Sequence, residues 1–311
     1  MSQPLPAPEL ATGRGARLRG TLRNPWRQPR LLAVYSWLFL AWAIIPVAIA
    51  VVFSFNAGRS RSTWQGFSLR WYLSDPDLSV LHDPTLHNAV QQSVKLAALT
   101  MLIATPIGVA MAIGLARWRG PVASGSNFLM LLPLVTPEIV LASGLLLVFA
   151  NLYRFGEVTL FGTPAQLFGH VTWAIPYVVV VIRGRLFGFG KEYEEAAMDL
   201  GASPTQAMRR VVLPLLAPAI FAAFMIVFAL SIDDFVTSQF LYKNEDTITI
   251  PMLIYGTGRT GTNPSLNAVA TVMLVLSLSA VVIAAVVLRS VARRRGGDGS
   301  SATRELVRFE I

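Results

Sequence analysis

The sequence contains no cysteine, only three histidines, and charged residues at only 14% of its positions. The absence of cysteine excludes disulfide bonds, thiol catalysis and thiolate metal sites, and it leaves the redox compartment open. His82, His87 and His170 show no spacing typical of metal ligands, so no metal site is predicted. Soluble domains are usually about 25% charged. A chain that is so poor in charge and 54% hydrophobic is therefore expected to lie in a membrane.

The sequence also lacks the motifs of common catalytic sites. It has no GxxxxGK[ST] phosphate loop, so the chain is not expected to hydrolyse ATP itself. It has no HExxH or GxSxG pattern, which leaves protease and lipase chemistry without support. The run Gly256 to Gly258 is expected in an outer loop, without the strand–helix context of a nucleotide site. We expect a chain that is not an enzyme, has no catalytic residues and binds no cofactor of its own.

Long stretches with few or no charged residues dominate what is present, and each can cross a hydrocarbon core of about 30 Å. They predict an all-α integral membrane protein with six transmembrane helices. A cleaved signal peptide is the alternative for the first stretch, but that stretch is too long and has no clear cleavage site. The predicted helices cover residues 31–55, 90–116, 126–152, 168–188, 215–240 and 266–290.

The net charge of +9 is explained by the orientation of the chain in the membrane rather than by nucleic-acid binding. With the N-terminus inside and six alternating spans, most Lys and Arg residues fall on the cytoplasmic side, as the positive-inside rule requires. Both termini are then cytoplasmic, and the basic excess also attracts anionic lipid. The predicted parts are a disordered basic arm at 1–30, a transmembrane domain at 31–292 and a flexible tail at 293–311.

The third predicted span contains two prolines and an acidic residue. Pro133 and Pro137 each remove a backbone donor and are expected to kink or break the helix. Broken helices are tolerated at membrane depth only where protein or a wet cavity satisfies the freed groups. The break is therefore either a packing kink or part of a pathway, and Glu138, directly after Pro137, favours a pathway.

Three carboxylates are predicted inside the membrane. Glu138 lies about 18 Å into its helix, and Asp233 and Asp234 lie about 27 Å into theirs, close to the outer face. A charge at the bilayer centre costs at least about 2.5 kcal/mol, so such residues normally face a bundle interior or a wet cavity. A structural role, such as a helix cap, and a role in lining the path of a cationic solute both remain open. We expect one of the two aspartates to face the path and the other to take a structural hydrogen bond.

The loop at residues 191–214 has strong local structure despite its polarity. Acidic residues in the first turn favour a helix from Glu192 to Leu200, and Gly201 is suited to end it in a left-handed conformation. Ser203 and Gln206 can then form a capping box, with Pro204 at the first helical position. The second helix is expected to end near Leu213, before Pro214. The small residues that the loop exposes suit close docking against another protein.

The spacing of this loop resembles the EAA loop of ABC importer permeases. Glu195-Ala196-Ala197, Gly201, Val211 and Leu213-Pro214 match the family pattern, with Val211 in place of the usual isoleucine. The resemblance implies a type I ABC importer permease fold with cytoplasmic coupling helices, in which this loop sits in a groove of an ATPase subunit. The implied docking residues are Glu194, Glu195, Ala196, Ala197, Asp199, Gly201, Ala202, Leu213 and Pro214.

Four further segments look like the spermidine/putrescine branch of that family. They are SFN at 54–56, GFSLRWY at 66–72, PLVTPEIV at 133–140 and LSIDDFVTSQF at 230–240. The resemblance implies a polyamine permease of the bacterial inner membrane. It also implies a second homologous permease, two ATPase subunits that carry ATP and Mg, and an extracytoplasmic solute-binding protein as partners. Carboxylates along a pore would lower the barrier for such a multiply charged solute.

Other cargoes and another transport class remain as alternatives. Branches for iron, opines and sulfate share parts of the same pattern. An ion-coupled secondary transporter could also use buried acids, although such folds often contain inverted repeats and none is found in the sequence.

Overall fold

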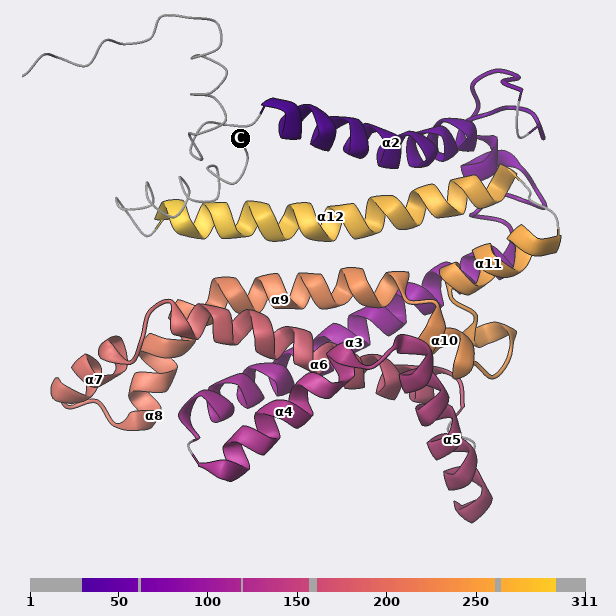
Figure 1. Cartoon of the computed structure of the whole chain (residues 1–311). Coiled ribbons are helices and arrows are strands. Elements are labelled where there is room, and N and C mark those ends of the chain that lie inside the picture. The colour runs from indigo at the N-terminus through magenta and orange to yellow at the C-terminus, as the bar shows by residue number, and fades with distance from the viewer. Residues whose placement is uncertain (1–29, 61–62, 119, 157–160, 261–263, 295–311) are drawn as a thin grey trace, which may run out of the picture. The chain divides into compact units, whose positions relative to one another are not determined.

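The computed structural model describes residues 30–60, 63–118, 120–156, 161–260 and 264–294 (Figure 1). Residues 1–29 of the predicted basic arm and residues 295–311 of the predicted tail lie outside these residues. The chain forms two compact units, Met1–Ile49 and Ala50–Ile311. The described residues are almost entirely helical, with one isolated bridge between Asn56 and Phe67. The helices are α2 (Arg30–Ser54), η1 (Arg70–Ser74), α3 (Pro84–Arg117), α4 (Pro121–Val135), α5 (Glu138–Gly156), α6 (Thr163–Phe187), α7 (Glu192–Asp199), α8 (Pro204–Ala207), η2 (Met208–Val212), α9 (Leu213–Asp233), α10 (Val236–Phe240), η3 (Glu245–Thr247), α11 (Ile250–Thr260) and α12 (Pro264–Arg294).

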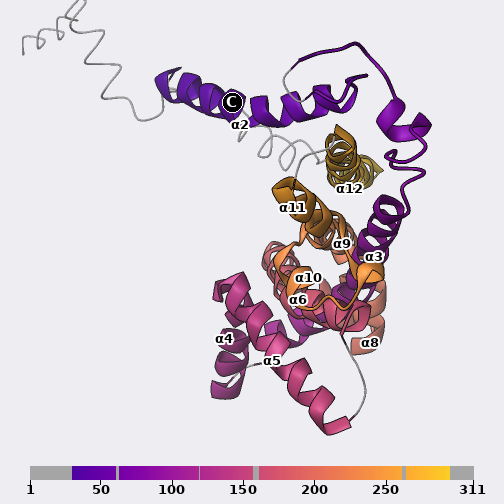
Figure 2. The same ribbon diagram turned by 90° about the vertical axis from the view of Figure 1, so that its right-hand side faces the viewer.

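Six candidate membrane spans are present among the described residues. Five helices are long and apolar enough to cross a membrane: α2, α3, α6, α12 and the continuous helix from Pro204 to Asp233. The sixth is the pair α4 and α5, which is bent by 105° (Figure 2). Counting this bent pair as one span gives six, the number that the sequence predicts. The third span, however, is broken into two helices, as its prolines suggested.

The centre of the second unit is formed by α3, α6 and α9 (Figure 1). Gly108 of α3 lies against α6, and a Cβ at this position would come within 2.6 Å of the Val178 Cβ. Small residues therefore let the two helix backbones approach closely, as a small-xxx-small ridge does in other membrane proteins. The buried apolar core contains Ala104, Val109, Ala112, Leu115, Met130, Ala174, Val178, Val179, Ile182, Val212, Leu216, Ala223 and Val227.

The remaining helices of this unit pack around the centre. α12 packs along α9, and α11 contacts both α12 and α3. The short helix α10 lies between α5 and α6. Gly169 makes this contact possible, because a Cβ there would come within 2.5 Å of the Thr237 Cγ2. The two short elements α10 and α11 close the end of the bundle opposite the loop at 191–214 (Figure 1).

The segment between α2 and α3 is ordered by a few hydrogen bonds. The Asn56 side chain donates to the carbonyl oxygens of Ser60 and Thr63, at 3.1 Å each, and accepts from the Gln65 N–H at 2.7 Å. The buried Trp71 donates its indole N–H to the Asn56 carbonyl at 2.6 Å. The residues of the SFN and GFSLRWY segments therefore form one local structure.

Several sequence predictions about element boundaries are wrong. The fifth predicted span, 215–240, is broken after Asp233, and two further differences have a local cause. Residues Gly256 to Gly258 lie inside α11 rather than in a loop, because α11 packs an apolar face against α3 and α12 and this contact outweighs its glycines. The second span begins at Pro84, several residues before its predicted start, because Asp83 caps it. The Asp83 carboxylate accepts from the backbone N–H of Thr85 at 2.8 Å.

Candidate functional site

The first feature of the site is the break between α4 and α5. Thr136 has extended backbone angles, φ −69° and ψ 129°, because the proline that follows it excludes the helical conformation. The break therefore falls at Thr136 and Pro137, whereas Pro133 is accommodated inside α4. It makes Glu138 the first residue of α5, where the helix dipole favours an acidic side chain.

The second feature is a matching break after α9. The helix ends at Asp233, and Asp234 is extended before α10 begins at Val236. The Asp234 Oδ2 accepts from the Ser238 backbone N–H at 2.9 Å and lies 3.2 Å from the Ser238 hydroxyl. Asp234 thus holds the start of α10, while Asp233 is exposed.

A fully buried histidine fixes Asp234 from the opposite side. The Nε2 of His170 lies 3.0 Å from the Asp234 Oδ2 and 3.0 Å from the Ser238 hydroxyl. Its Nδ1 lies 2.7 Å from the hydroxyl of Ser231 on α9. Both ring nitrogens therefore have partners, and His170 ties α6 to the two helices that flank the break.

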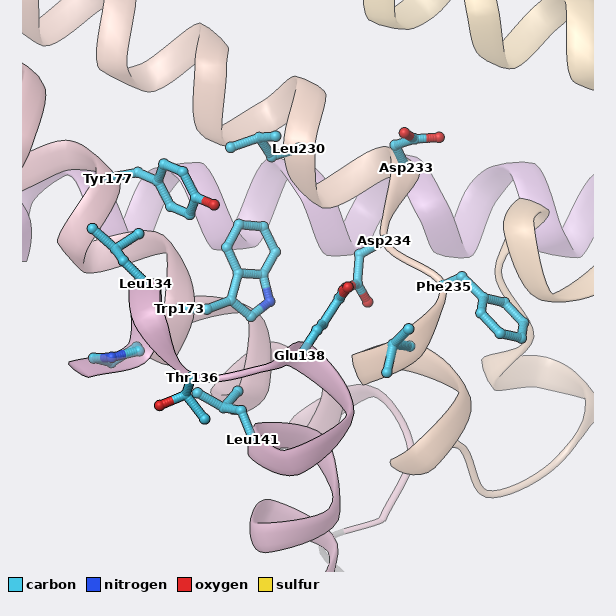
Figure 3. Close-up of a pocket in the computed structure, with 12 residues that line it drawn as sticks. Leu134, Thr136, Glu138, Leu141, Trp173, Tyr177, Leu230, Asp233, Asp234 and Phe235 are labelled. Atoms are coloured by element: carbon cyan, nitrogen blue, oxygen red, sulfur yellow. The ribbon is translucent and has the colours of Figure 1, made fainter. Parts of the chain in front are cut away.

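The two breaks meet at a cavity of about 480 Å³ (Figure 3). The carboxyl group of Glu138 points toward that of Asp234, and the two groups lie side by side on the cavity lining (Figure 3). Trp173 and Tyr177, one turn apart on α6, form an aromatic wall with ring centroids 6.1 Å apart. The described residues that line the cavity include no Lys or Arg. They are Pro133, Leu134, Thr136, Glu138, Leu141, Trp173, Tyr177, Leu230, Asp233, Asp234, Phe235 and Val236.

All three carboxylates that the sequence singled out line the cavity, but only Glu138 and Asp234 face each other, and the Asp233 carboxyl group points away from them (Figure 3). The structure divides the two aspartates into a buried, hydrogen-bonded Asp234 and an exposed Asp233 on the cavity lining. Sequence reasoning missed Trp173, Tyr177 and His170. The two aromatic residues could have been predicted to share one face of a helix, because they lie four positions apart in a span without full charges. Nothing in the sequence predicted the contact of His170, except that histidine is rare in this chain.

The loop at residues 191–214 is the second candidate site. α7 ends in a Schellman motif: the N–H of Gly201 donates to the Met198 carbonyl at 2.9 Å, and that of Ala202 donates to the Ala197 carbonyl at 3.0 Å. Gly201 has φ +88°, as the motif requires. Ser203 and Gln206 form the expected capping box at α8. These local features agree with the sequence prediction.

The predicted end of the second loop helix before Pro214 is wrong. α8, η2 and α9 form one continuous helix from Pro204 to Asp233. The π-turn of η2, at Met208–Val212, widens the helix just before the proline. This wider turn supplies room for the Pro214 ring and shifts the hydrogen bonding, so the missing N–H does not end the helix.

The expected docking residues divide between two faces of the loop. Glu195, Ala196, Asp199, Gly201 and Pro214 are exposed, whereas Glu194, Ala197, Ala202 and Leu213 are partly buried. Sequence reasoning missed the large apolar side chains on the outer face. Leu200 is 90% exposed, and Tyr193 and Met198 are exposed beside it. The loop therefore presents apolar anchors as well as small residues, which is the composition of an interface core.

A helical bundle with an acidic cavity between two broken spans, and a structured loop at one end, is the architecture of a membrane permease. The family model described as "binding-protein-dependent transport system inner membrane component" matches residues 104–295. The chain belongs to this family and is a multi-pass inner-membrane permease of an ABC transport complex. Family membership also decides against the ion-coupled secondary transporter.

Two relatives are similar over most of their length. The chain is 36% identical over 272 residues to the spermidine/putrescine transport system permease protein PotC of Escherichia coli (strain K12), covering 86% of this chain and 96% of that protein. It is 35% identical over 257 residues to the putrescine transport system permease protein PotI of the same strain, covering 81% and 87%. The predicted family is thereby confirmed.

A solved structure with a similar fold is a bacterial ABC transporter involved in the import of the acidic polysaccharide alginate. Its TM-score is 0.68 at 16% identity, over 88% of this chain and 99% of that one. This likeness confirms the predicted fold class, an all-α permease of the type I ABC importer fold.

Proposed function

We propose that the chain forms half of the translocation pathway of a polyamine importer and that the acidic cavity accepts the cationic solute. The observation that carries the proposal is that Glu138, Asp233 and Asp234 all line one cavity, whose lining includes no Lys or Arg among the described residues. The names of the relatives PotC and PotI point to the same solute class.

The chemistry of the cavity fits a chain of ammonium groups joined by methylenes. Two carboxyl groups that face each other repel unless a cation or a proton lies between them. An ammonium group in the cavity beside Glu138 and Asp234 would relieve this repulsion and donate to Glu138. Trp173 and Tyr177 offer ring faces to a second ammonium group and apolar area to the methylenes. An anionic cargo such as sulfate would meet only like charge here.

The loop at residues 191–214 is proposed as the docking surface for the ATPase. Its exposed residues Leu200, Glu195 and Gly201 support this role. In the proposed complex the chain pairs with a second, homologous permease, two ATPase subunits hold ATP and Mg, and an extracytoplasmic binding protein delivers the solute. Both termini and the loop then lie on the cytoplasmic side. ATP-driven closure of the ATPase pair moves the loops and switches the cavity between the two sides by rigid-body motion.

The test is uptake of labelled spermidine and putrescine by the complete complex in proteoliposomes. Glu138→Gln and Asp233→Asn should each lower ATP-dependent uptake by about tenfold, a change of about 1.4 kcal/mol in the transport barrier. Glu245→Gln is the matched control, because Glu245 is exposed and does not line the cavity. Wild-type uptake of both cavity variants would contradict the role of the cavity. Competition by unlabelled iron, opine or sulfate would identify another cargo.

A further inference from the structure

An ion pair joins the loop at residues 191–214, here called the docking loop, to the long span α3. The Nη2 of Arg117 donates to both carboxylate oxygens of Glu194, at 2.7 Å and 2.6 Å. Arg117 is in the last turn of α3, and Glu194 is in the first turn of α7. Each charge therefore lies at the helix end whose dipole favours it, and the pair connects the two ends.

The surroundings of the pair are not tightly packed. A cavity of about 170 Å³ lies between the ends of α3 and α6 and the start of α7, and Arg117 and Glu194 both line it. The main packing of α7 is against α8 and η2, which belong to the same loop. The ion pair thus lies at the edge of an open cavity whose lining is mostly apolar.

The exposure of the pair argues against a role in stability alone. The Arg117 side chain is 39% exposed and that of Glu194 is 18% exposed. An ion pair so close to solvent contributes little to the stability of a fold. Its fixed geometry at the boundary between two elements points to the transmission of motion instead.

The other end of α3 is joined to the wall of the acidic cavity. The Gln92 Nε2 donates to the Gln166 Oε1 at 2.9 Å, and the Gln166 Nε2 donates to the Ser238 carbonyl at 3.1 Å. Ser238 is the residue whose backbone N–H binds Asp234. A single helix of 34 residues therefore has the docking loop at one end and the support of Asp234 at the other.

We propose that the Arg117–Glu194 pair transmits displacement of the docking loop to α3, so that Glu194 is a positioning residue rather than a contact to the ATPase. This inference rests on the proposed docking function of the loop. Glu194 is the acidic residue of this loop that is turned toward its own chain, whereas Glu195, next to it, is exposed. A displacement of α7 pulls the end of α3 through the pair and reaches the cavity wall along the helix.

A charge-swap cycle tests the proposal in the complete complex in proteoliposomes. The variants are Arg117→Glu, Glu194→Arg and the double variant with both changes, and the readout is solute transported per ATP hydrolysed. Each single variant should lower this ratio by about fivefold, within the range for residues that couple two sites. The double variant restores the pair with reversed charges and should recover most of the loss.

Two matched charge reversals control for nonspecific effects. Glu192→Arg changes an acid in the same first turn of α7 and loses the same helix-dipole interaction. Arg185→Glu changes an exposed base in the last turn of α6. Both controls should keep the wild-type ratio. Co-purification of the ATPase should be normal in every variant of the cycle.

A second readout does not depend on the cargo. The chain has no cysteine, so Thr136→Cys introduces a single thiol at the acidic cavity. Addition of ATP with vanadate should change the rate at which this thiol is labelled when Arg117 and Glu194 are both present. It should not change that rate when Thr136→Cys is combined with Arg117→Glu or with Glu194→Arg. Loss of ATPase co-purification in Glu194→Arg, with no recovery in the double variant, would overturn the proposal and make Glu194 a docking contact. Single variants with normal coupling and normal labelling would also overturn it.

The same experiments separate this inference from the proposed function. If the wild-type complex hydrolyses ATP but transports no polyamine, the proposed cargo is wrong. The labelling measurement then still tests whether the ion pair transmits motion. If the control Glu195→Lys leaves ATPase binding unchanged, the docking surface itself is wrong.

Discussion

The Nε2 of His170 lies 3.0 Å from the Oδ2 of Asp234, and both side chains are almost completely buried. The histidine comes from α6, and the aspartate comes from the break between α9 and α10. Because Ser231 and Ser238 bind the same ring, the pair fixes the geometry of the break. Asp234 is therefore the structural member of the acidic cavity, and its position depends on His170.

Replacement of His170 should disturb both stability and transport. His170→Leu removes a hydrogen-bond partner of buried Asp234, Ser231 and Ser238, and leaving a buried polar group without its partner typically costs about 1–3 kcal/mol. We expect a lower unfolding temperature of the purified complex and strongly reduced uptake. His170→Gln is the comparison variant, because its amide can still donate toward Asp234, and its losses should be smaller. Equal stability of the leucine variant and the wild type would show that the contact is not needed.

Substitutions at Gly201 should show whether ATPase binding depends on the backbone conformation of this residue or on direct contact with it. A Cβ at this position would meet nothing within 4 Å, so the obstacle to a side chain is the φ of +88°. A β-branched residue in this conformation costs about 1–2 kcal/mol, whereas Asn tolerates it. Gly201→Val should therefore weaken ATPase co-purification more than Gly201→Asn does. If both variants lose binding equally, the ATPase must approach the Gly201 backbone itself.

The features of this protein that the sequence predicts are mainly local. The capping box at Ser203 and the left-handed Gly201 follow from residues within one or two turns. The continuation of the helix through Pro214 could not be predicted in this way, because it depends on a π-turn at Met208–Val212. The apolar length of a span is also local information, and the six spans were therefore predictable.

The composition of the acidic cavity was only partly predictable, because its members are distant in the sequence. Glu138 and Asp234 were each recognisable as acids in apolar surroundings, but nothing in the sequence indicates that two broken helices meet. The His170 contact needs α6 to pass between the two breaks. Such a contact depends on close helix packing at Gly169, where the partner Thr237 is far along the chain.

The segment between α2 and α3 should lose stability in acid. Burial raises the pKa of Asp75, but hydrogen bonds from Arg70 and from the backbone N–H groups of Asp77 and Leu78 outweigh it and hold the pKa below its ordinary value of 3.8. A carboxylate with a lowered folded-state pKa contributes stability that is present above the unfolded-state pKa and is lost as the pH falls through the folded-state pKa.

The measurement compares the wild type with Asp75→Asn in thermal unfolding. The variant should unfold at a lower temperature at about pH 7, and the difference should shrink as the pH falls below the ordinary pKa of 3.8 and through the lowered pKa of Asp75 in the folded state. Asp77→Asn is the matched control, because the Asp77 side chain is exposed and only its backbone N–H contacts Asp75. A difference between wild type and Asp75→Asn that does not change with pH would contradict the role of the charge.

Two glycines of α3 should respond in opposite ways to the same substitution. A Cβ at Gly108 would lie 2.6 Å from the Val178 Cβ and 3.2 Å from the Ile175 carbonyl oxygen, so Gly108→Ala forces α3 and α6 apart. Overpacking of this kind typically costs about 1–3 kcal/mol. A Cβ at Gly114 would meet nothing within 4 Å, so Gly114→Ala should be neutral or stabilising by up to about 1 kcal/mol.

Thermal unfolding of the two variants in detergent measures this difference. A second substitution, at Val178, tests whether the cost of Gly108→Ala comes from the contact with that side chain. Val178→Ala removes the atoms nearest to the new methyl group, so the double variant Gly108→Ala/Val178→Ala should be more stable than the sum of the two single effects. Neighbouring substitutions that share a contact commonly show such non-additivity, of about 0.5–3 kcal/mol. If the effects of the two changes simply add, the close approach of α3 and α6 at Gly108 is not what limits the side chain there.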